Sequence, residues 1–441
     1  MLTDVSALVA HNPPARHGGA AVADVDGDGQ FEVVVAGIDG PTRVLKWAGG
    51  RLRDAAPPAL AGPARGFAAG DLDGDGAEEL YVLAAGPDRL FQRHPDGRWE
   101  DLLARPENRP VRPPVGGRGA AAIDRRGGGR YGFFVAADGW PGRLVELGPD
   151  GRLTDLAPPL DLARPGGRAV LAAPLFGDRT DLFAAAEGGP NLLFRNRGDG
   201  TFAECAAALG LADAGEDGRA AVALDLAGRF GLCWGNGDGP HRLMVPHAGG
   251  PWRDRATPAL ALPSAAGAVL VADLDNDGDD ELVVTSAGEA NRLFRLTPDG
   301  ASDFTLTRLD PGAAADPDGG GTGAVAADLD GDGVLELLVT HGGAGPRPLG
   351  VYKVFPAAGN GWLRILPLTR FGAPARGAVV RAEYGGRGRA KAVGGSEPVA
   401  HFGLGRAGRV DRVTVMWPDG AALTLADPDV NCTYRVPYPG G

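Results

Sequence analysis

The sequence predicts an all-β protein: a seven-bladed β-propeller closed by its own N-terminal strand, followed by a small β-rich C-terminal domain. Three observations predict this fold class. First, 73 glycines and 37 prolines among 441 residues interrupt the chain too often for long helices. Second, 44% of the residues are hydrophobic, which is enough to form several cores. Third, a strand–loop–strand segment recurs about every fifty residues, a repeat length typical of propeller blades.

The repeat is clearest in four segments in which an acidic loop joins two β-rich runs. These loops share the pattern Asp-x-Asp-x-Asp-Gly-x-x-Glu, and they begin at Asp24, Asp71, Asp273 and Asp328. The long gap between the second and third loops leaves room for three degenerate copies, which begin at Asp124, Pro174 and Asp225. Each of the seven units has enough short apolar runs for about four strands, so each is predicted to form one blade.

Both ends of the chain complete the predicted architecture. The N-terminal segment LTDVSAL resembles the fourth strand of a unit, FAECAAAL, whereas the last unit has only three strands before a new pattern begins. We therefore expect the N-terminal strand to complete the seventh blade, which leaves no open sheet edge in the ring. The propeller is predicted to span residues 1–356 and the β-rich domain residues 360–441.

The acidic loops have the composition of calcium sites. Carboxylates occupy loop positions 1, 3, 5 and 9, a backbone carbonyl is available at position 7, and glycine at position 6 permits a sharp bend. Calcium prefers about six to eight such hard oxygen ligands, whereas magnesium keeps more water in a smaller octahedron. We therefore predict about four calcium ions, which hold the first hairpin of each blade together and take no part in chemistry.

The predicted metal ligands are the residues at these five positions of the four loops. They are Asp24, Asp26, Asp28, Gln30 and Glu32; Asp71, Asp73, Asp75, Ala77 and Glu79; Asp273, Asp275, Asp277, Asp279 and Glu281; and Asp328, Asp330, Asp332, Val334 and Glu336. The three degenerate loops are not predicted to bind metal, because Arg126, Pro174 and Arg229 stand at ligand positions. A guanidinium that takes the place of the missing cation is a hypothesis for these loops.

A ligand is expected at the opposite face of the propeller. The blade connectors lie there, around the mouth of the central channel. Six residues before the first residue of the loop, four consecutive units carry an arginine: Arg65, Arg118, Arg168 and Arg219. Guanidinium groups suit carboxylate or phosphate oxygens, so this basic arc predicts an anionic ligand. The alternative is that the arginines pair with neighbouring acids such as Asp217, or pack along the rim.

Histidines and tryptophans near the same face are further candidates. A histidine can transfer a proton near neutral pH, so the candidate catalytic residues are His17, Arg65 and Arg118. The candidate ligand-binding residues are His11, Arg168, Arg219, His341, Trp140 and Trp234. The alternative interpretation is that the histidines are solvated and that the tryptophans pack in a core or at the rim.

Charge, cysteine content and the absence of common motifs limit the function classes. The net charge of −12 argues against nucleic acid or an anionic membrane as partner. Three cysteines do not form a disulfide scaffold. The first residues lack a signal-peptide pattern, and no apolar run reaches the roughly 20 residues of a membrane span, so a cytoplasmic location is expected. No phosphate loop, zinc spacing or dinucleotide fingerprint is present, so no organic cofactor is expected.

The acidic repeats and the tail resemble known families. The loops look like FG-GAP/VCBS propeller repeats, and the tail resembles the ASPIC/UnbV domain in the segments Asn360-GWLRILPL, Ala375-RGAVVRAEYGG, His401-FGLG and Val410-DRVTVMWPDG. The whole arrangement is similar to the cartilage acidic protein family and to UnbV-type proteins of enediyne gene clusters. The resemblance implies calcium in the loops and leaves the ligand open.

Three functions are compatible with these features. The first is a calcium-stabilised propeller of bacterial secondary metabolism that binds a small or extended ligand, with anionic character, opposite its loops. The second, implied by the UnbV resemblance, is a non-redox cyclase or isomerase of natural-product biosynthesis that uses His17 and the arginines. The third is an extracellular adhesion or matrix-type binding protein. The sequence does not indicate an oligomeric state.

Overall fold

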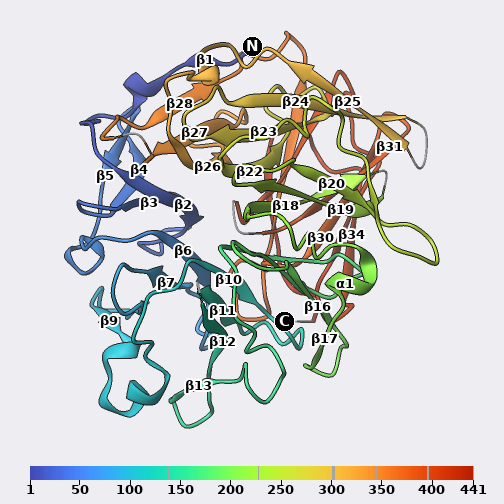
Figure 1. The fold of residues 1–441 in the computed structure, drawn as a ribbon. Helices are drawn as coiled ribbons and strands as arrows, with labels where there is room; N and C mark the ends of the chain where they lie inside the picture. Colours follow the sequence, from blue (N-terminus) through green and yellow to red (C-terminus); the bar gives the residue numbers. More distant parts are fainter. Residues whose placement is uncertain (138, 227, 300–302, 344, 395–396, 441) are drawn as a thin grey trace.

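The structure is a computed structural model that describes residues 1–440 except 138, 227, 300–302, 344 and 395–396. Seven four-stranded antiparallel sheets succeed one another around a common axis (Figure 1). The innermost strands contact each other in cyclic order, from β2 through β6, β10, β14, β18 and β22 to β26 and back to β2. This closed ring of radial sheets is a seven-bladed β-propeller.

Six of the blades are continuous in sequence, and in each of them the strands follow one another from the innermost outward. The first three blades are β2 (His17–Ala23), β3 (Glu32–Gly37), β4 (Arg43–Ala48) and β5 (Arg51–Asp54); β6 (Gly66–Gly70), β7 (Glu79–Leu83), β8 (Arg89–Arg93) and β9 (Trp99–Asp101); and β10 (Gly119–Ile123), β11 (Gly132–Ala137), β12 (Trp140–Leu147) and β13 (Leu153–Asp155). The next three are β14 (Ala169–Ala173), β15 (Asp181–Ala185), β16 (Leu192–Asn196) and β17 (Phe202–Glu204); β18 (Gly218–Leu226), β19 (Arg229–Asn236), β20 (Arg242–Val245) and β21 (Arg253–Asp254); and β22 (Ala266–Ala272), β23 (Asp280–Ser286), β24 (Arg292–Asp299) and β25 (Asp303–Leu309).

The seventh blade joins the two ends of the propeller. It consists of β26 (Gly321–Ala327), β27 (Glu336–His341), β28 (Gly350–Lys353) and the N-terminal β1 (Thr3–Asp4). Strand β1 runs antiparallel to β28, with Thr3 opposite Lys353 and Asp4 opposite Tyr352. The prediction that the N-terminal strand completes the last blade is therefore confirmed.

The cores of the propeller lie between neighbouring blades. Strand residues alternate between the two faces of each sheet, so apolar side chains of one blade pack against those of the next. Between the fourth and fifth blades, for example, Phe183 and Trp234 are fully buried with ring centroids 5.6 Å apart. The inner strands consist mainly of alanine and glycine, because the blades converge toward the axis and leave no room for larger side chains.

The helical segments are short. One α-helical turn, α1, spans Ala206–Leu209, and the 3-10 segments are η1 (Ser6–Leu8), η2 (Pro58–Leu60), η3 (Leu102–Ala104), η4 (Pro106–Val111) and η5 (Gly312–Ala315). Among the described residues, no helix is long and apolar enough to cross a membrane.

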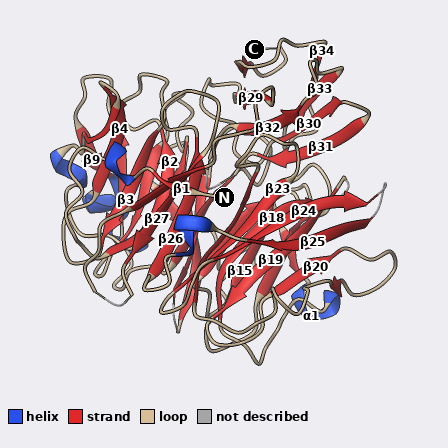
Figure 2. Ribbon diagram, turned by 90° about the horizontal axis from the view of Figure 1, so that it is seen from above, coloured by secondary structure: helices blue, strands red, loops and turns tan. Residues whose placement is uncertain are grey.

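The C-terminal residues form a separate β domain, called the cap below (residues 360–440). Its two sheets have the strand orders β32-β29-β35 and β31-β30-β33-β34. The strands are β29 (Gly361–Pro367), β30 (Val379–Tyr384), β31 (Arg387–Ala392), β32 (Ala400–Gly405), β33 (Arg412–Met416), β34 (Ala422–Ala426) and β35 (Thr433–Val436). They gather beyond one face of the propeller (Figure 2), around a core that contains Phe402 and Trp417.

Candidate functional site

The four acidic loops share one backbone arrangement. The first aspartate of each loop accepts a hydrogen bond from the N–H at position 6, as Asp71 Oδ2 does from Gly76 (3.1 Å) and Asp24 Oδ2 from Gly29 (2.8 Å). The position-6 glycines have φ between +84° and +92°, a left-handed conformation that favours glycine. The predicted role of this glycine in the bend is thus confirmed.

The carboxylates at positions 3, 5 and 9 each use one oxygen to hold the loop. In the second loop, Asp73 Oδ1 accepts from the N–H of Asp75 (3.0 Å), Asp75 Oδ1 from that of Ala77 (2.8 Å), and Glu79 Oε2 from that of Leu72 (2.7 Å). The other three loops repeat these hydrogen bonds at the equivalent positions. The second oxygens at positions 3, 5 and 9 are called the cation site of the loop below.

Each loop can bring carboxylate oxygens close enough to share an ion. Ligand atoms from three acids lie within 4.8 Å of one another in every loop; the groups are Asp24, Asp26 and Glu32; Asp71, Asp73 and Glu79; Asp273, Asp275 and Glu281; and Asp328, Asp330 and Asp332. Hard oxygens in a tight turn are the donor set that calcium prefers. The loops therefore fit calcium.

In three loops a basic side chain from the third strand of the same blade already occupies the cation site. Lys46 Nζ lies 2.5 Å from Asp26 Oδ2, 2.6 Å from Asp28 Oδ2 and 3.4 Å from Glu32 Oε1. Arg295 makes the same three contacts in the loop that begins at Asp273, and Lys353 makes them in the loop that begins at Asp328.

The loop that begins at Asp71 differs. The equivalent third-strand residue is the neutral Gln92, whose Nε2 donates to Asp73 Oδ2 (2.5 Å). Burial raises the pKa of Glu79 to about 9, and the neighbouring Asp73 and Asp71 add to that shift. Burial also raises the pKa of Asp71 to about 7. A divalent cation here would favour the ionised carboxylates and would lower both pKa values.

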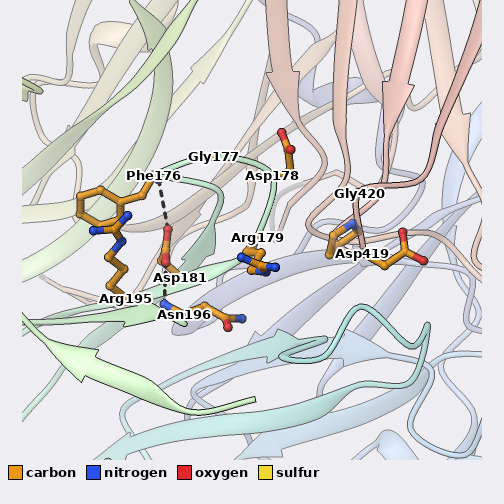
Figure 3. A pocket seen from close by; sticks show the side chains of 10 residues that line it. Phe176, Gly177, Asp178, Arg179, Asp181, Arg195, Asn196, Asp419 and Gly420 are labelled. Atoms are coloured by element: carbon orange, nitrogen blue, oxygen red, sulfur yellow. Dashed lines mark hydrogen bonds between the residues drawn. The ribbon is translucent and has the colours of Figure 1, made fainter. Parts of the chain in front are cut away.

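The degenerate loops replace the cation site with other contacts. In the third blade Arg125, rather than the hypothesised Arg126, pairs with Glu146 of the third strand (2.5 Å). In the fourth blade the Asp181 carboxylate accepts backbone N–H groups from Leu175, Phe176 and Asn196. A hollow of about 300 Å³ lies between this loop and the cap turn at Asp419 (Figure 3). The Asp181 carboxylate thus stabilises the backbone of this loop through three hydrogen bonds.

The cap covers the face of the propeller that carries the acidic loops. The Arg376 guanidinium, which is buried, binds Glu78 through Nε (2.5 Å) and Nη2 (3.0 Å) and donates to the Val22 carbonyl (2.9 Å). Arg364 Nη1 donates to Asp328 Oδ2 (2.8 Å), and Lys391 pairs with Asp280. The cap therefore closes one end of the central channel with basic groups that face acids of the loops.

The other end of the channel is an open cavity of about 610 Å³. All four predicted arginines, Arg65, Arg118, Arg168 and Arg219, line it. The equivalent residues of three other blades, Gly18, Gly267 and Thr322, line it too. An added Cβ would lie 2.3 Å from the Arg65 carbonyl oxygen at Gly18 and 1.7 Å from that of Gly321 at Gly267, so these two positions exclude any side chain.

One acid lies among the arginines of this mouth. Glu187, in the hairpin between β15 and β16, pairs with Arg168, with Arg219 (2.9 Å) and with Arg118 (3.8 Å). Burial opposes ionisation of Glu187, but its bonds to Arg168 and Arg219 outweigh that effect and lower its pKa. The alternative that the arginines pair with neighbouring acids is confirmed for these three, although the acid is Glu187 and not the suggested Asp217, which accepts the N–H of Gly188 (2.7 Å).

The predicted histidines and tryptophans lie outside the residues that line the cavity. His17 is 2% exposed, and burial together with Arg43 and His341 lowers its pKa to about 4. His341 is buried between Asp316 (2.8 Å) and the Pro348 carbonyl (2.7 Å), and His11 is exposed. Trp234 is buried and donates to Asp213 (3.0 Å), whereas Trp140 is half exposed on its hairpin. Their roles in ligand binding stay predictions.

Sequence reasoning missed the third-strand cations, Glu187 and the cap arginines. One signal was available: Lys46, Lys353 and Lys391 are the only lysines in the sequence. Each of them pairs with an acid of the loop face. The rarity of lysine in this sequence therefore marked these three positions as worth aligning with the acidic loops.

Comparisons with known proteins agree with this architecture. The FG-GAP-like repeat matches residues 24–82 and 273–339, and the ASPIC and UnbV family matches residues 372–441. Cartilage acidic protein 1 of Homo sapiens is 38% identical over 97% of this chain and 73% of its own length, and that of Mus musculus is 38% identical over 97% and 75%. An ancestral GH74 enzyme, 14% identical, aligns with a TM-score of 0.51 over 77% of this chain and 48% of its own, which reflects the fold alone.

Proposed function

The chain belongs to the cartilage acidic protein 1 family, and from this premise we propose that it is a calcium-stabilised propeller that binds an anionic ligand at the arginine-lined mouth of its channel. Calcium would be held on the opposite face, by the carboxylates of the acidic loops. There the ion joins the first two strands of a blade, so its contribution is to rigidity and to the support of the cap.

The observation that carries the proposal is the charge at the two ends of the channel. The loop end is covered by the cap, whereas four arginines from four consecutive blades converge on the open end. Glu187 is shared by three of them. No ion pair or hydrogen bond of the Arg65 side chain is found among the described residues, so this guanidinium is available to a ligand.

The rigidity of the mouth favours binding. Arg65, Arg118 and Arg168 each stand one residue before an inner strand, and Arg219 lies within β18, so the ring fixes their backbone positions. Guanidinium groups that are already placed lose less conformational entropy when they bind carboxylate or phosphate oxygens. The cavity is wide enough for a small anion or for one end of an extended one.

The test is a binding measurement with inorganic phosphate and with citrate, by titration calorimetry. We expect the double variant Arg65→Ala/Arg118→Ala to bind at least one of them roughly tenfold or more weakly than wild type, because each charge-assisted bond contributes about 1.5–3 kcal/mol. Arg152→Ala, at an exposed arginine of a strand turn, is the matched control and should bind as wild type does. Equal affinity in the double variant and wild type would contradict the proposal.

A matrix-type binding role is a second candidate, because the two relatives at 38% identity carry the name cartilage acidic protein. The arginine-lined mouth of the channel would then bind an extended anion such as a sulfated oligosaccharide. This candidate predicts that a sulfated oligosaccharide binds more tightly than phosphate and loses affinity in the same arginine variant. We do not propose the cyclase or isomerase role, since it relies on His17, which is buried away from the cavity.

A further inference from the structure

We propose that the four acidic loops fall into two classes: the loop that begins at Asp71 binds one divalent cation tightly, and the other three carry their own cation. Lys46, Arg295 and Lys353 supply that internal charge. This inference rests on the proposed calcium binding, and it differs from the expectation of about four bound ions.

The four loops share one geometry and differ in the third-strand residue that reaches the cation site. Each uses the same oxygens to hold its backbone and directs the second oxygens of positions 3, 5 and 9 at the cation site. The residue opposite position 9 on the third strand reaches that site. The register places Arg295 opposite Glu281 and Lys353 opposite Glu336.

The same register applies to the first and second blades, which carry the other two acidic loops. Val33 pairs with Leu45 and Leu80 pairs with Phe91, so Lys46 follows opposite Glu32 and Gln92 opposite Glu79. The four blades therefore place a lysine, a glutamine, an arginine and a lysine at one structural position. Only the glutamine is uncharged.

An internal cation competes with calcium for the same oxygens. Lys353 binds Asp330 (2.8 Å), Asp332 (2.9 Å) and Glu336, and the cap's Arg364 adds a second positive charge at Asp328 (2.8 Å). A calcium ion there would have to displace an ammonium that is tethered to the same blade, and would then be repelled by it at close range. Affinity in these three loops is therefore reduced.

Among the described residues, no basic side chain forms an ion pair with the carboxylates at the cation site of the Asp71 loop. Glu79 is 1% exposed, and no donor to its Oε1 is found in the part of the chain that the structure describes. An unpaired buried carboxylate oxygen is costly, and a bound cation removes that cost. The Gln92 side chain can also turn its amide oxygen toward the ion, because the two amide atoms are interchangeable in this position.

The surroundings of the Asp71 loop also favour retention of an ion. The cap residue Phe371 covers it: an added Cβ on Gly74 would lie 3.2 Å from the Phe371 ring. Arg130 stacks on that ring, with Cζ 5.4 Å from the ring centroid. The ion would thus sit under an aromatic cover at the boundary between propeller and cap.

The test is a calcium titration of the full chain, after chelation, in wild type and two reciprocal variants. Wild type should bind one calcium ion at least tenfold more tightly than any other. Gln92→Lys places an ammonium in the Asp71 cation site and should lose that ion, whereas Gln92→Met, which is neutral, should keep it with reduced affinity. Lys46→Gln should gain a second tight ion in the loop that begins at Asp24.

A melting curve separates metal loss from misfolding. A chelator should lower the melting temperature of wild type, but it should not change that of Gln92→Lys, because the internal ammonium replaces the ion. Four equally tight ions in wild type, or a tight ion retained in Gln92→Lys, would overturn this inference while leaving the proposed calcium binding intact. No bound calcium in wild type would overturn both.

Discussion

The two ends of the central channel are opposite in charge and in access. At the loop end, acids of the blades pair with Lys46, Arg295, Lys353 and basic residues of the cap, which lies over this face (Figure 2). At the other end, the four predicted arginines line an open cavity, and three of them share Glu187. Acidic and basic groups that neutralise one another at the loop end stabilise the fold, whereas the arginines of the open end are only partly neutralised and can bind a ligand. Each end can therefore be disturbed separately.

The largest expected effect is a loss of stability at the loop end of the channel. Glu78→Gln leaves the buried Arg376 guanidinium without its counter-ion, and removal of one partner from a buried pair costs about 3–5 kcal/mol. Urea unfolding of the full chain measures the loss. We expect the cap to detach from the propeller first, so that the unfolding transition becomes broader or splits in two.

A second variant tests whether the charge pair itself is required. Glu78→Leu/Arg376→Leu replaces both charges with apolar groups and should recover much of the lost free energy of unfolding. A loss of less than about 1 kcal/mol in Glu78→Gln would mean that the cap is held by other contacts, because that value is typical of exposed pairs.

An intermediate effect is expected on anion affinity at the arginine-lined end of the channel. Glu187→Gln removes the acid that Arg168, Arg219 and Arg118 share, so the positive charge at the mouth of the channel is less neutralised within the chain. Phosphate affinity measured by calorimetry should rise about tenfold, or about 1.4 kcal/mol. Weaker or unchanged phosphate binding would mean that Glu187 positions the arginines for the ligand instead of competing with it.

The smallest expected effect is a pH dependence at the loop end. The folded-state pKa values of Asp71 (about 7) and Glu79 (about 9) lie above their ordinary values, so the folded chain favours the protonated forms. The associated stability is full at low pH and is lost as pH rises through about 7 to 9. In chelator the melting temperature should therefore fall by a few degrees from pH 5 to pH 9.

Two comparisons identify the source of that pH dependence. Calcium should flatten the profile, since it stabilises the ionised carboxylates, and Glu79→Gln should flatten much of it without calcium. If the profile in chelator were already flat in wild type, the Asp71 loop would be compensated by a charge other than a bound ion.

The sequence predicted the ring because each unit repeats the same local chemistry. The acidic loops mark where each blade begins along the sequence. The degenerate copies at Asp124, Pro174 and Asp225 recur at the same spacing, so blades that lack an acidic loop could also be located. The N-terminal strand was recognisable by its pattern and by the missing strand of the last unit. These inferences needed only local pattern and period.

The contacts that distinguish the sites depend on what lies opposite in space. Lys46, Gln92, Arg295 and Lys353 occupy one structural position, but they lie 22, 21, 22 and 25 residues after the first aspartate of their loops. Spacing alone therefore could not align them. Glu187 reaches three arginines from a neighbouring hairpin, and no sequence pattern indicates that reach. The hypothesised guanidinium cations were assigned to the degenerate loops, whereas internal cations occupy three of the intact ones.

One end of the channel is proposed to hold metal, and the other to bind an anion. The most direct test is an anomalous-difference map from crystals of the wild-type chain grown with calcium and soaked in tungstate, a tetrahedral analogue of phosphate. We predict calcium density between Asp73, Asp75 and Glu79 and tungsten density in the cavity beside Arg65 and Arg118. Tungsten at the loop face, or no calcium in the Asp71 loop, would contradict the account.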